Sequence, residues 1–419
     1  VISDSPITAT ISDISTWIGG TSSDWSISSN WNTNVVPTTA KVLIPSGLTN
    51  YPTVTDGINV STSNITIESG ASLIASGTST VAGNVTYKRN LTFTAGNSEG
   101  WHLVGSPVSG QAYNNVYATT NSLATSVNKR GLATYNNGVA TDNWIYLEDD
   151  DSNSGTFGTA TGYSFKTSAT VDVSFTGAMN TDNVDKAITI GATPFNLISN
   201  PFTSYINSEA FLDLASNSEK LTSKTIWIWN PSTKNHDAKI SSEGFKVAPG
   251  QGFFVSGSTA GNLTFEEGIQ SHNTADTFLK AEARPEIILN TTDGELIRYT
   301  KIYYNGIATK GFDNGYDGET FGGVPNSFDV FTQLLEDNQG KNYQIQSIPN
   351  SDLESMVIPV GLKAAAGKEI TFSVKVLNLP SHLEIFLEDR ENNIFTSLDD
   401  TNNHKVTLTT VLNGIGRFY

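Results

Sequence analysis

One stretch of this 419-residue sequence occurs twice, and this repeat constrains the fold more than any other feature. Residues 101–107 read Trp-His-Leu-Val-Gly-Ser-Pro, and residues 195–201 read Phe-Asn-Leu-Ile-Ser-Asn-Pro. Matching landmarks follow both copies in the same order: 144–146 with 227–229, 162–165 with 252–255, and 173–177 with 263–268. We therefore interpret the middle of the chain as a tandem duplication of one unit of roughly ninety residues, whose apolar face is completed by folding or by its twin.

The landmarks have the pattern of β-strands. In residues 171–175 apolar and polar residues alternate, and Gly, Pro and Asn punctuate such runs. Pro107 and Pro201 lack a backbone donor, so each should end the first strand of its unit. We interpret these motifs as core and turn residues, and we expect the two units to share one strand order. Four residues are expected to point into the cores from the first strands: Leu103, Val104, Leu197 and Ile198.

The rest of the chain also favours β-structure. Short apolar runs at close spacing precede the repeats, and seven alternating runs follow them. The 36 glycines indicate many turns, and the sequence contains one plausible helix, at 208–215. We predict an all-β chain: an N-terminal β-solenoid or small sandwich, two duplicated β-sandwich-like units, and a C-terminal antiparallel β-sandwich of the jelly-roll type. The predicted domains are 1–87, 88–184, 185–280 and 281–419.

Composition excludes several classes of function. With a net charge of −17, the protein offers no basic surface for nucleic acid, and an anionic lipid surface would repel the protein. No apolar run is long enough for a transmembrane helix. The absence of cysteine excludes disulfides, thiolate zinc sites and cysteine nucleophiles. Because the chain begins with Val1 and shows no leader, we expect a processed protein or an excised fragment.

Three tryptophans lie within fifteen residues near the start of the chain: Trp17, Trp25 and Trp31. Flat indole faces stack on pyranose rings, so one hypothesis is a carbohydrate-binding surface. The alternative is that the three rings are buried as the cap of the solenoid, because an open solenoid end needs protection.

Two acidic runs are candidate calcium sites. Asp149, Asp151 and Asn153 stand at alternate positions before Gly155, as at the start of a calcium loop, but Ala160 stands where the distal glutamate is expected. A solvated acidic turn is the alternative. The second run contains Asp313, Asp317 and Glu319, and an Asx-type turn explains it equally well.

No catalytic arrangement is visible in the sequence. The five histidines are scattered, and neither a nucleophile elbow nor a phosphate-binding loop occurs. Paired carboxylates can come from distant strands, so four glutamates are candidates by residue type alone: Glu99, Glu148, Glu243 and Glu266. We expect a protein that is not an enzyme.

Several strings resemble proteins exported by the type IX secretion system. They occupy residues 17–45, 101–107, 200–202, 248–255, 311–317, 387–390 and 412–419, and the most specific is Pro-Gly-Gln-Gly-Phe-Phe-Val at 249–255. In that class the Gly-Arg-Phe-Tyr type of strand end is commonly followed by a sorting domain that is removed on export. The resemblance implies a secreted protein displayed on the exterior of the outer membrane, here without the sorting domain.

Three functional hypotheses follow. The first is a noncatalytic surface protein, either an adhesin or a structural coat or filament component, whose partners are other surface proteins or surface polysaccharide. The second is a carbohydrate-binding module, and the third is the accessory region of a larger secreted hydrolase. Self-assembly is also possible through residues 1–14, since Ile7, Ala9 and Ile11 alternate with polar residues and could pair with an open sheet edge of a neighbour.

Overall fold

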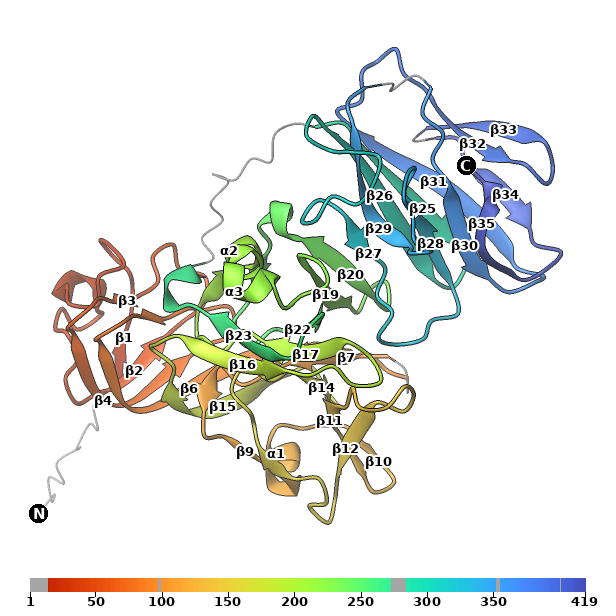
Figure 1. Cartoon of the computed structure of the whole chain (residues 1–419). Helices are drawn as coiled ribbons and strands as arrows, with labels where there is room; N and C mark the ends of the chain where they lie inside the picture. Colours follow the sequence, from red (N-terminus) through yellow and green to blue (C-terminus); the bar gives the residue numbers. More distant parts are fainter. Residues whose placement is uncertain (1–13, 97–98, 273–283, 352–354, 400) are drawn as a thin grey trace, which may run out of the picture.

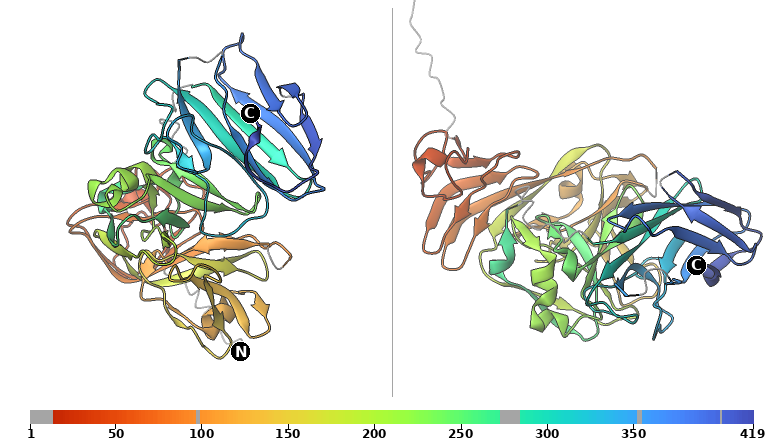
Figure 2. Two further views of the ribbon diagram at one scale, coloured as in Figure 1. Left: turned by 45° about the vertical axis from the view of Figure 1, so that its right-hand side comes forward. Right: turned by 90° about the horizontal axis from the view of Figure 1, so that it is seen from above.

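The computed structural model describes residues 14–96, 99–272, 284–351, 355–399 and 401–419. Strands dominate the described chain, which confirms the all-β prediction. The N-terminal part and the C-terminal domain lie at opposite ends of the molecule, with the two repeat units between them (Figures 1 and 2).

The N-terminal part is a β-solenoid. Strands β1, β2, β4 and β6 stack in parallel, and β3 and β5 form a second parallel pair. Parallel stacking of successive short strands favours the solenoid over the sandwich. Strand β6 runs through the expected boundary at residue 87, because its second half pairs antiparallel with a strand of the first unit. The elements are β1 Ile14–Thr16, η1 Ser28–Asn30, β2 Lys41–Ile44, β3 Thr53–Val54, β4 Asn59–Ile67, β5 Ile74–Ala75 and β6 Thr80–Leu91.

The two repeat units have the same strand order. The four-stranded path is β7-β14-β11-β12 in the first unit and β17-β22-β19-β20 in the second, so each reads first, fourth, second and third strand. The first unit contains β7 Trp101–Val104, β8 Val108–Ser109, β9 Ala112–Tyr113, α1 Asn115–Thr120, β10 Thr125–Ser126, β11 Lys129–Tyr135, β12 Trp144–Glu148, β13 Gly155–Thr156, β14 Tyr163–Lys166 and β15 Val171–Met179. The second contains β16 Val184–Ile188, β17 Phe195–Ser199, β18 Tyr205–Asn207, α2 Ser208–Asp213, α3 Ala215–Ser218, β19 Thr225–Asn230, β20 Asn235–Ile240, η2 Ser241–Glu243, β21 Lys246–Val247, β22 Gly252–Ser256, β23 Gly261–Phe265, η3 Glu267–Ile269 and β24 Gln270–Ser271.

Details of the hydrogen bonding repeat as well. The Asn121 side chain accepts from the Ser174 amide at 2.7 Å, and the Asn217 side chain accepts from the Thr264 amide at 2.8 Å. The first bond ties the C-terminal end of α1 to β15, and the second ties α3 to β23. The duplication therefore extends beyond the apolar pattern to individual polar contacts.

One of the sequence correspondences was wrong. Trp144 lies on β12, the third of the four strands in chain order, whereas Trp227 lies on β19, the second of its four. Pairing with the neighbouring strands makes His236 the structural counterpart of Trp144. The two aromatic triplets look alike because both occupy half-buried middle strands, where aromatic and β-branched residues pack well.

The units join through an approximate two-fold relation. The Gly105 amide donates to the Gly250 carbonyl at 2.8 Å, and the equivalent Ser199 amide donates to the Ala160 carbonyl at 3.0 Å. This approach is so close that a Cβ on Gly252 would lie 2.8 Å from the Leu103 carbonyl carbon. Each unit thus completes its twin, and the first strands β7 and β17 lie at the join.

The C-terminal domain is one rolled, nearly closed sheet. Its path is β33-β32-β35-β30-β28-β29-β26-β25-β31-β34, with β27 paired to β29. The expected antiparallel jelly-roll sandwich is corrected on two points: one continuous sheet replaces two, and β26 pairs in parallel with β29. The strands are β25 Glu286–Thr292, β26 Ile297–Asn305, β27 Gly318–Glu319, β28 Asp329–Thr332, β29 Tyr343–Pro349, β30 Val360–Ala364, β31 Glu369–Leu377, β32 Ile385–Asp389, β33 Ile394–Leu398, β34 His404–Thr407 and β35 Leu412–Phe418.

Candidate functional site

The tryptophan cluster of the solenoid is buried. Trp17 and Trp31 are fully inaccessible and Trp25 is 2% exposed. Their rings pack against one another, with centroids 5.0 Å apart for Trp17 and Trp31 and 4.7 Å apart for Trp25 and Trp31. The indole Nε1 of Trp31 donates to the Trp25 carbonyl at 3.0 Å. No ring face is left for a sugar, so the carbohydrate-binding hypothesis is corrected at these residues, and the cluster forms the core of the first coil.

The first calcium candidate does not converge. Asp151 accepts from the Asn115 amide at 2.5 Å, the Asn153 side chain donates to the Tyr146 carbonyl at 2.9 Å, and Asp149 lies 3.7 Å from Arg130. The three side chains therefore bind protein groups in three directions, as in the alternative interpretation of a polar turn.

The second candidate is brought together only in part. Asp313 and Asp317 are neighbours, since the Asp313 amide donates to Asp317 at 2.6 Å, while Glu319 pairs with Lys341 at 2.5 Å. Burial raises the pKa of Asp317 to about 6, against hydrogen bonds from Asp313 and Ser347. Within the described part of the chain, no three His, Asp or Glu side chains are grouped to hold a metal ion.

None of the four glutamates named as possible acids, Glu266 included, belongs to the lining of a pocket described below. Glu99 pairs with Lys234 at 2.8 Å, and Glu243 pairs with Lys301. Glu148 accepts from the Asn128 side chain at 2.8 Å. These partners give Glu99, Glu148 and Glu243 structural roles.

A different site lies in the first unit, on the sheet face whose counterpart in the second unit is covered by the C-terminal domain. In the second unit this face carries Leu197, Trp227 and Phe254, and the C-terminal domain covers it with Phe321 and Ile345. Strand pairing places Leu103, Ala133 and Ser164 at the corresponding positions of the first unit. The face that is filled in the second unit therefore holds a cavity in the first, where Ser164 stands in the place of a buried phenylalanine.

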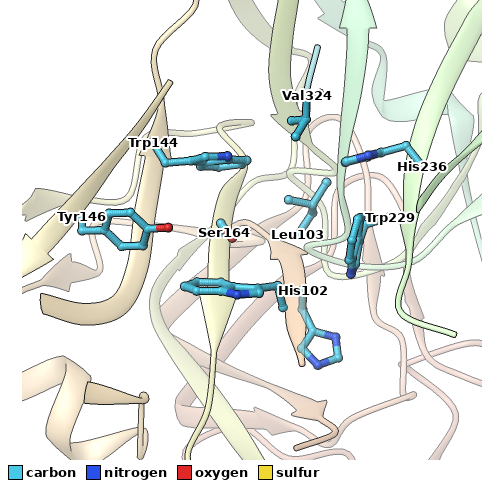
Figure 3. A pocket seen from close by; sticks show the side chains of 9 residues that line it. His102, Leu103, Trp144, Tyr146, Ser164, Trp229, His236 and Val324 are labelled. Carbon is cyan, nitrogen blue, oxygen red and sulfur yellow. The ribbon is translucent and has the colours of Figure 1, made fainter. Parts of the chain in front are cut away.

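The open face forms a pocket of about 150 Å³, hereafter the aromatic pocket. Figure 3 shows Trp144 and Tyr146 on one side and Trp229 and His236 on the other, with Ser164 between them. It is lined by Trp101, His102, Leu103, Trp144, Tyr146, Ser164, Trp229, His236 and Val324. The pocket is smaller than sites for drug-sized ligands, which occupy about 300–1,000 Å³, so it suits a single ring.

Polar groups in the pocket are few and neutral. Burial lowers the pKa of His236 to about 3, so this imidazole is uncharged at neutral pH. Burial also lowers the pKa of His102, whose Nε2 donates to the Thr92 carbonyl at 2.9 Å and leaves Nδ1 as an acceptor. The buried indole N–H of Trp229 has no hydrogen-bond partner among the described residues. A ligand hydroxyl could donate to Nδ1 of His102 or accept from the indole N–H of Trp229.

A second cavity of about 240 Å³ adjoins the first and shares His102, Leu103 and Trp229 with it. We call it the polar pocket. Its lining is Arg89, Asn90, Leu91, His102, Leu103, Val104, Ile228, Trp229, Pro231, Gln251 and Gly252. Neither pocket has an aspartate or glutamate in its lining.

Sequence reasoning missed this site because its aromatic residues served as repeat landmarks and were interpreted as core. The available signal was the difference between the units. Ser164 corresponds to Phe254, ninety positions apart in matching strings. A small residue in place of a large core residue marks a cavity or a site.

Comparison with known proteins gives one match. A family model described as a domain of unknown function, DUF8693, matches residues 49–246 and again residues 234–413. Each matched segment is longer than one ninety-residue unit. No curated protein and no solved structure matches the chain. Since the two matches span well over half of the sequence, the chain belongs to the DUF8693 family, whose domain it carries twice in tandem.

Proposed function

We propose that this protein is a noncatalytic, exported cell-surface protein, an adhesin that binds surface polysaccharide through the aromatic pocket. One observation carries the proposal: the sheet face that is sealed in the second unit is open and lined by aromatic rings in the first. A cavity lined by aromatic rings, at a position that the twin unit fills with side chains, favours binding over a purely structural role.

The chemistry of the lining supports a sugar ligand. Three tryptophans and a tyrosine offer flat apolar faces, while few polar groups are present to orient a ring. Neutral His102 and the unpartnered Trp229 N–H supply one acceptor and one donor. This combination suits a pyranose, whose faces are apolar and whose edge carries hydroxyls.

Export and display at the exterior of the outer membrane are the corresponding proposal for location, and they rest on the resemblance to type IX secretion substrates. Among the described residues no helix is long and apolar enough to cross a membrane.

The test is binding to an array of bacterial, algal and host polysaccharides. Tyr146→Ala, which removes one wall of the pocket, should weaken binding at least tenfold while the protein stays folded. Ile145→Ala is the matched control, because Ile145 lies on the same strand, faces the other way and is 40% exposed. Equal loss in both variants, or wild-type protein that binds no polysaccharide, would count against the proposal.

A second candidate, a filament component, has its own supporting observation. An apolar groove of about 250 Å³ opens in the C-terminal domain beside β33, a strand that pairs with β32 alone within the described ranges. Phe395 on β33 is 67% exposed. Such an edge accepts an extended peptide through main-chain hydrogen bonds.

The proposed occupant is residues 1–13 of a second copy, which lie outside the described residues. Their alternation of Ile7, Ala9 and Ile11 matches a strand with one apolar face. The chain enters β1 at the opposite end of the molecule from the groove (Figure 1). A head-to-tail contact between copies would therefore propagate instead of closing.

Deleting residues 1–13 should abolish polymers seen by light scattering and electron microscopy, and Phe395→Asp should do the same by placing a charge on the groove. Polymers that survive both changes, or full-length protein that stays monomeric at high concentration, would refute assembly by this route.

A further inference from the structure

We infer that the site selects acidic sugars, with the carboxylate of a uronic-acid-type residue bound by Arg89 in the polar pocket. This inference rests on the proposed function, because the ring that carries or neighbours the carboxylate must occupy the aromatic pocket. It adds the charge class of the ligand and the residue that recognises it.

Arg89 is a cation without a carboxylate partner. It lies on β6, half-buried, and it forms no ion pair with any of the described residues. Arg89 lies near the Tyr87 hydroxyl, whose pKa burial raises to about 12 against the opposing effect of the guanidinium. The buried Tyr87 hydroxyl has no hydrogen-bond partner among the described residues, so Arg89 does not bind it. The donors of Arg89 are thus available to a ligand.

The surroundings of Arg89 favour an anion. Asn90 and Gln251 add amide groups to the polar pocket, which has no carboxylate in its lining. On the aromatic side, the Lys166 ammonium lies 5.7 Å from the Trp101 ring centre and the Lys129 ammonium 5.0 Å from that of Tyr146. The linings of the two pockets thus contain Arg89 and no aspartate or glutamate; Asp172, which accepts from the Asn90 side chain at 2.9 Å, lies outside both linings.

The geometry of the guanidinium decides between a carboxylate and a simple hydroxyl. Arginine presents donors in a planar fork that matches the two oxygens of a carboxylate, and such charge-assisted pairs are roughly twice as strong as neutral hydrogen bonds. Because Trp229 and His102 line both pockets, one ligand can occupy the aromatic pocket with its ring and the polar pocket with its charge.

The experiment compares two matched ligands, an oligouronate and the same oligosaccharide with its carboxyl groups reduced to alcohols, by calorimetry at fixed ionic strength. Wild-type protein should bind the oligouronate roughly tenfold to a hundredfold more tightly. Arg89→Gln should remove this preference and leave binding of the reduced oligosaccharide unchanged, and Arg89→Lys should retain only part of it.

Lys88→Gln is the control, because Lys88 is the adjacent residue and pairs with Glu68 at 3.0 Å. It should keep the wild-type preference. Equal affinity of wild-type protein for both ligands, or a preference that survives Arg89→Gln, would overturn the acidic-sugar inference while the proposed function stands. Failure of the wild-type protein to bind either ligand would overturn the acidic-sugar inference, and the polysaccharide array then decides whether the proposed function stands. A sulfated oligosaccharide that binds in place of the uronate would overturn the assignment of a carboxylate.

Discussion

Filling the aromatic pocket from within should abolish ligand binding without unfolding the protein. The perturbation is Ser164→Phe, which places in the first unit the residue that the second unit has as Phe254. Ser164 is 7% exposed at the base of a cavity of about 150 Å³. A cavity of about 150 Å³ accommodates a benzene molecule, so the phenyl ring fits and takes up the space of the ligand.

The two contributions to stability nearly cancel. Burying the ring gains about 1.5–3 kcal/mol, and imperfect packing costs about 1–3 kcal/mol. The net change in the free energy of unfolding should stay within about 2 kcal/mol, or a Tm shift of less than about 8 °C at 2–4 °C per kcal/mol.

Thermal unfolding and polysaccharide binding are measured on Ser164→Phe and on Ser164→Ala, which keeps the pocket open. The phenylalanine variant should show no saturable binding, and the alanine variant should bind within about threefold of wild type. A folded Ser164→Phe protein that binds normally would refute the placement of the ligand in this pocket.

Two further predictions concern stability. Gly252→Ala should lower the Tm by several degrees, because its Cβ would meet the Leu103 backbone at 2.8 Å and overpacking costs about 1–3 kcal/mol. Gly268→Ala is the control and should change the Tm little, because the space at its Cβ is open. A Gly252→Ala protein with an unchanged Tm would contradict the close contact between the two units. Arg417→Met should destabilise by roughly 3 kcal/mol, because it leaves the fully buried Asp389 without its two contacts of 3.0 and 2.9 Å. Burial alone would raise the pKa of Asp389, but Arg417 and the hydrogen bonds from Asn392 together hold the pKa below its ordinary value. The stability from this pair is therefore present above the ordinary carboxyl pKa and is lost as the pH falls through the lowered value, and denaturation curves between neutral and acidic pH should show this loss in wild type but not in the variant.

The repeat was predictable because it rests on local patterns. The strings at 101–107 and 195–201 occupy equivalent strands, β7 and β17, as expected. The mismatch between Trp144 and Trp227 carried a warning in its spacing: 227 − 144 is 83, whereas 201 − 107 is 94 and 252 − 162 is 90. Alternating aromatic triplets identify a strand but not its rank in the sheet.

The site could not be predicted because it depends on what covers each sheet face. Trp25 and Trp229 are both tryptophans, and the sequence does not distinguish their environments. Trp25 packs inside the first coil, whereas Trp229 lines a pocket. Phe321 covers the face of the second unit. It lies in a loop some ninety residues after Trp227, so this contact is long-range in sequence. Charge gave no hint either, since Arg89 is a single cation whose role arises from the absence of carboxylates around it.

The central claim is that ligand binds on the open face of the first unit. The most direct measurement is a crystal structure of the wild-type protein with an acidic oligosaccharide selected by the array. The account predicts a sugar ring between Trp144, Tyr146 and Trp229, with its carboxylate on Arg89. A ligand bound elsewhere, with the aromatic pocket empty at saturating concentration, would contradict it.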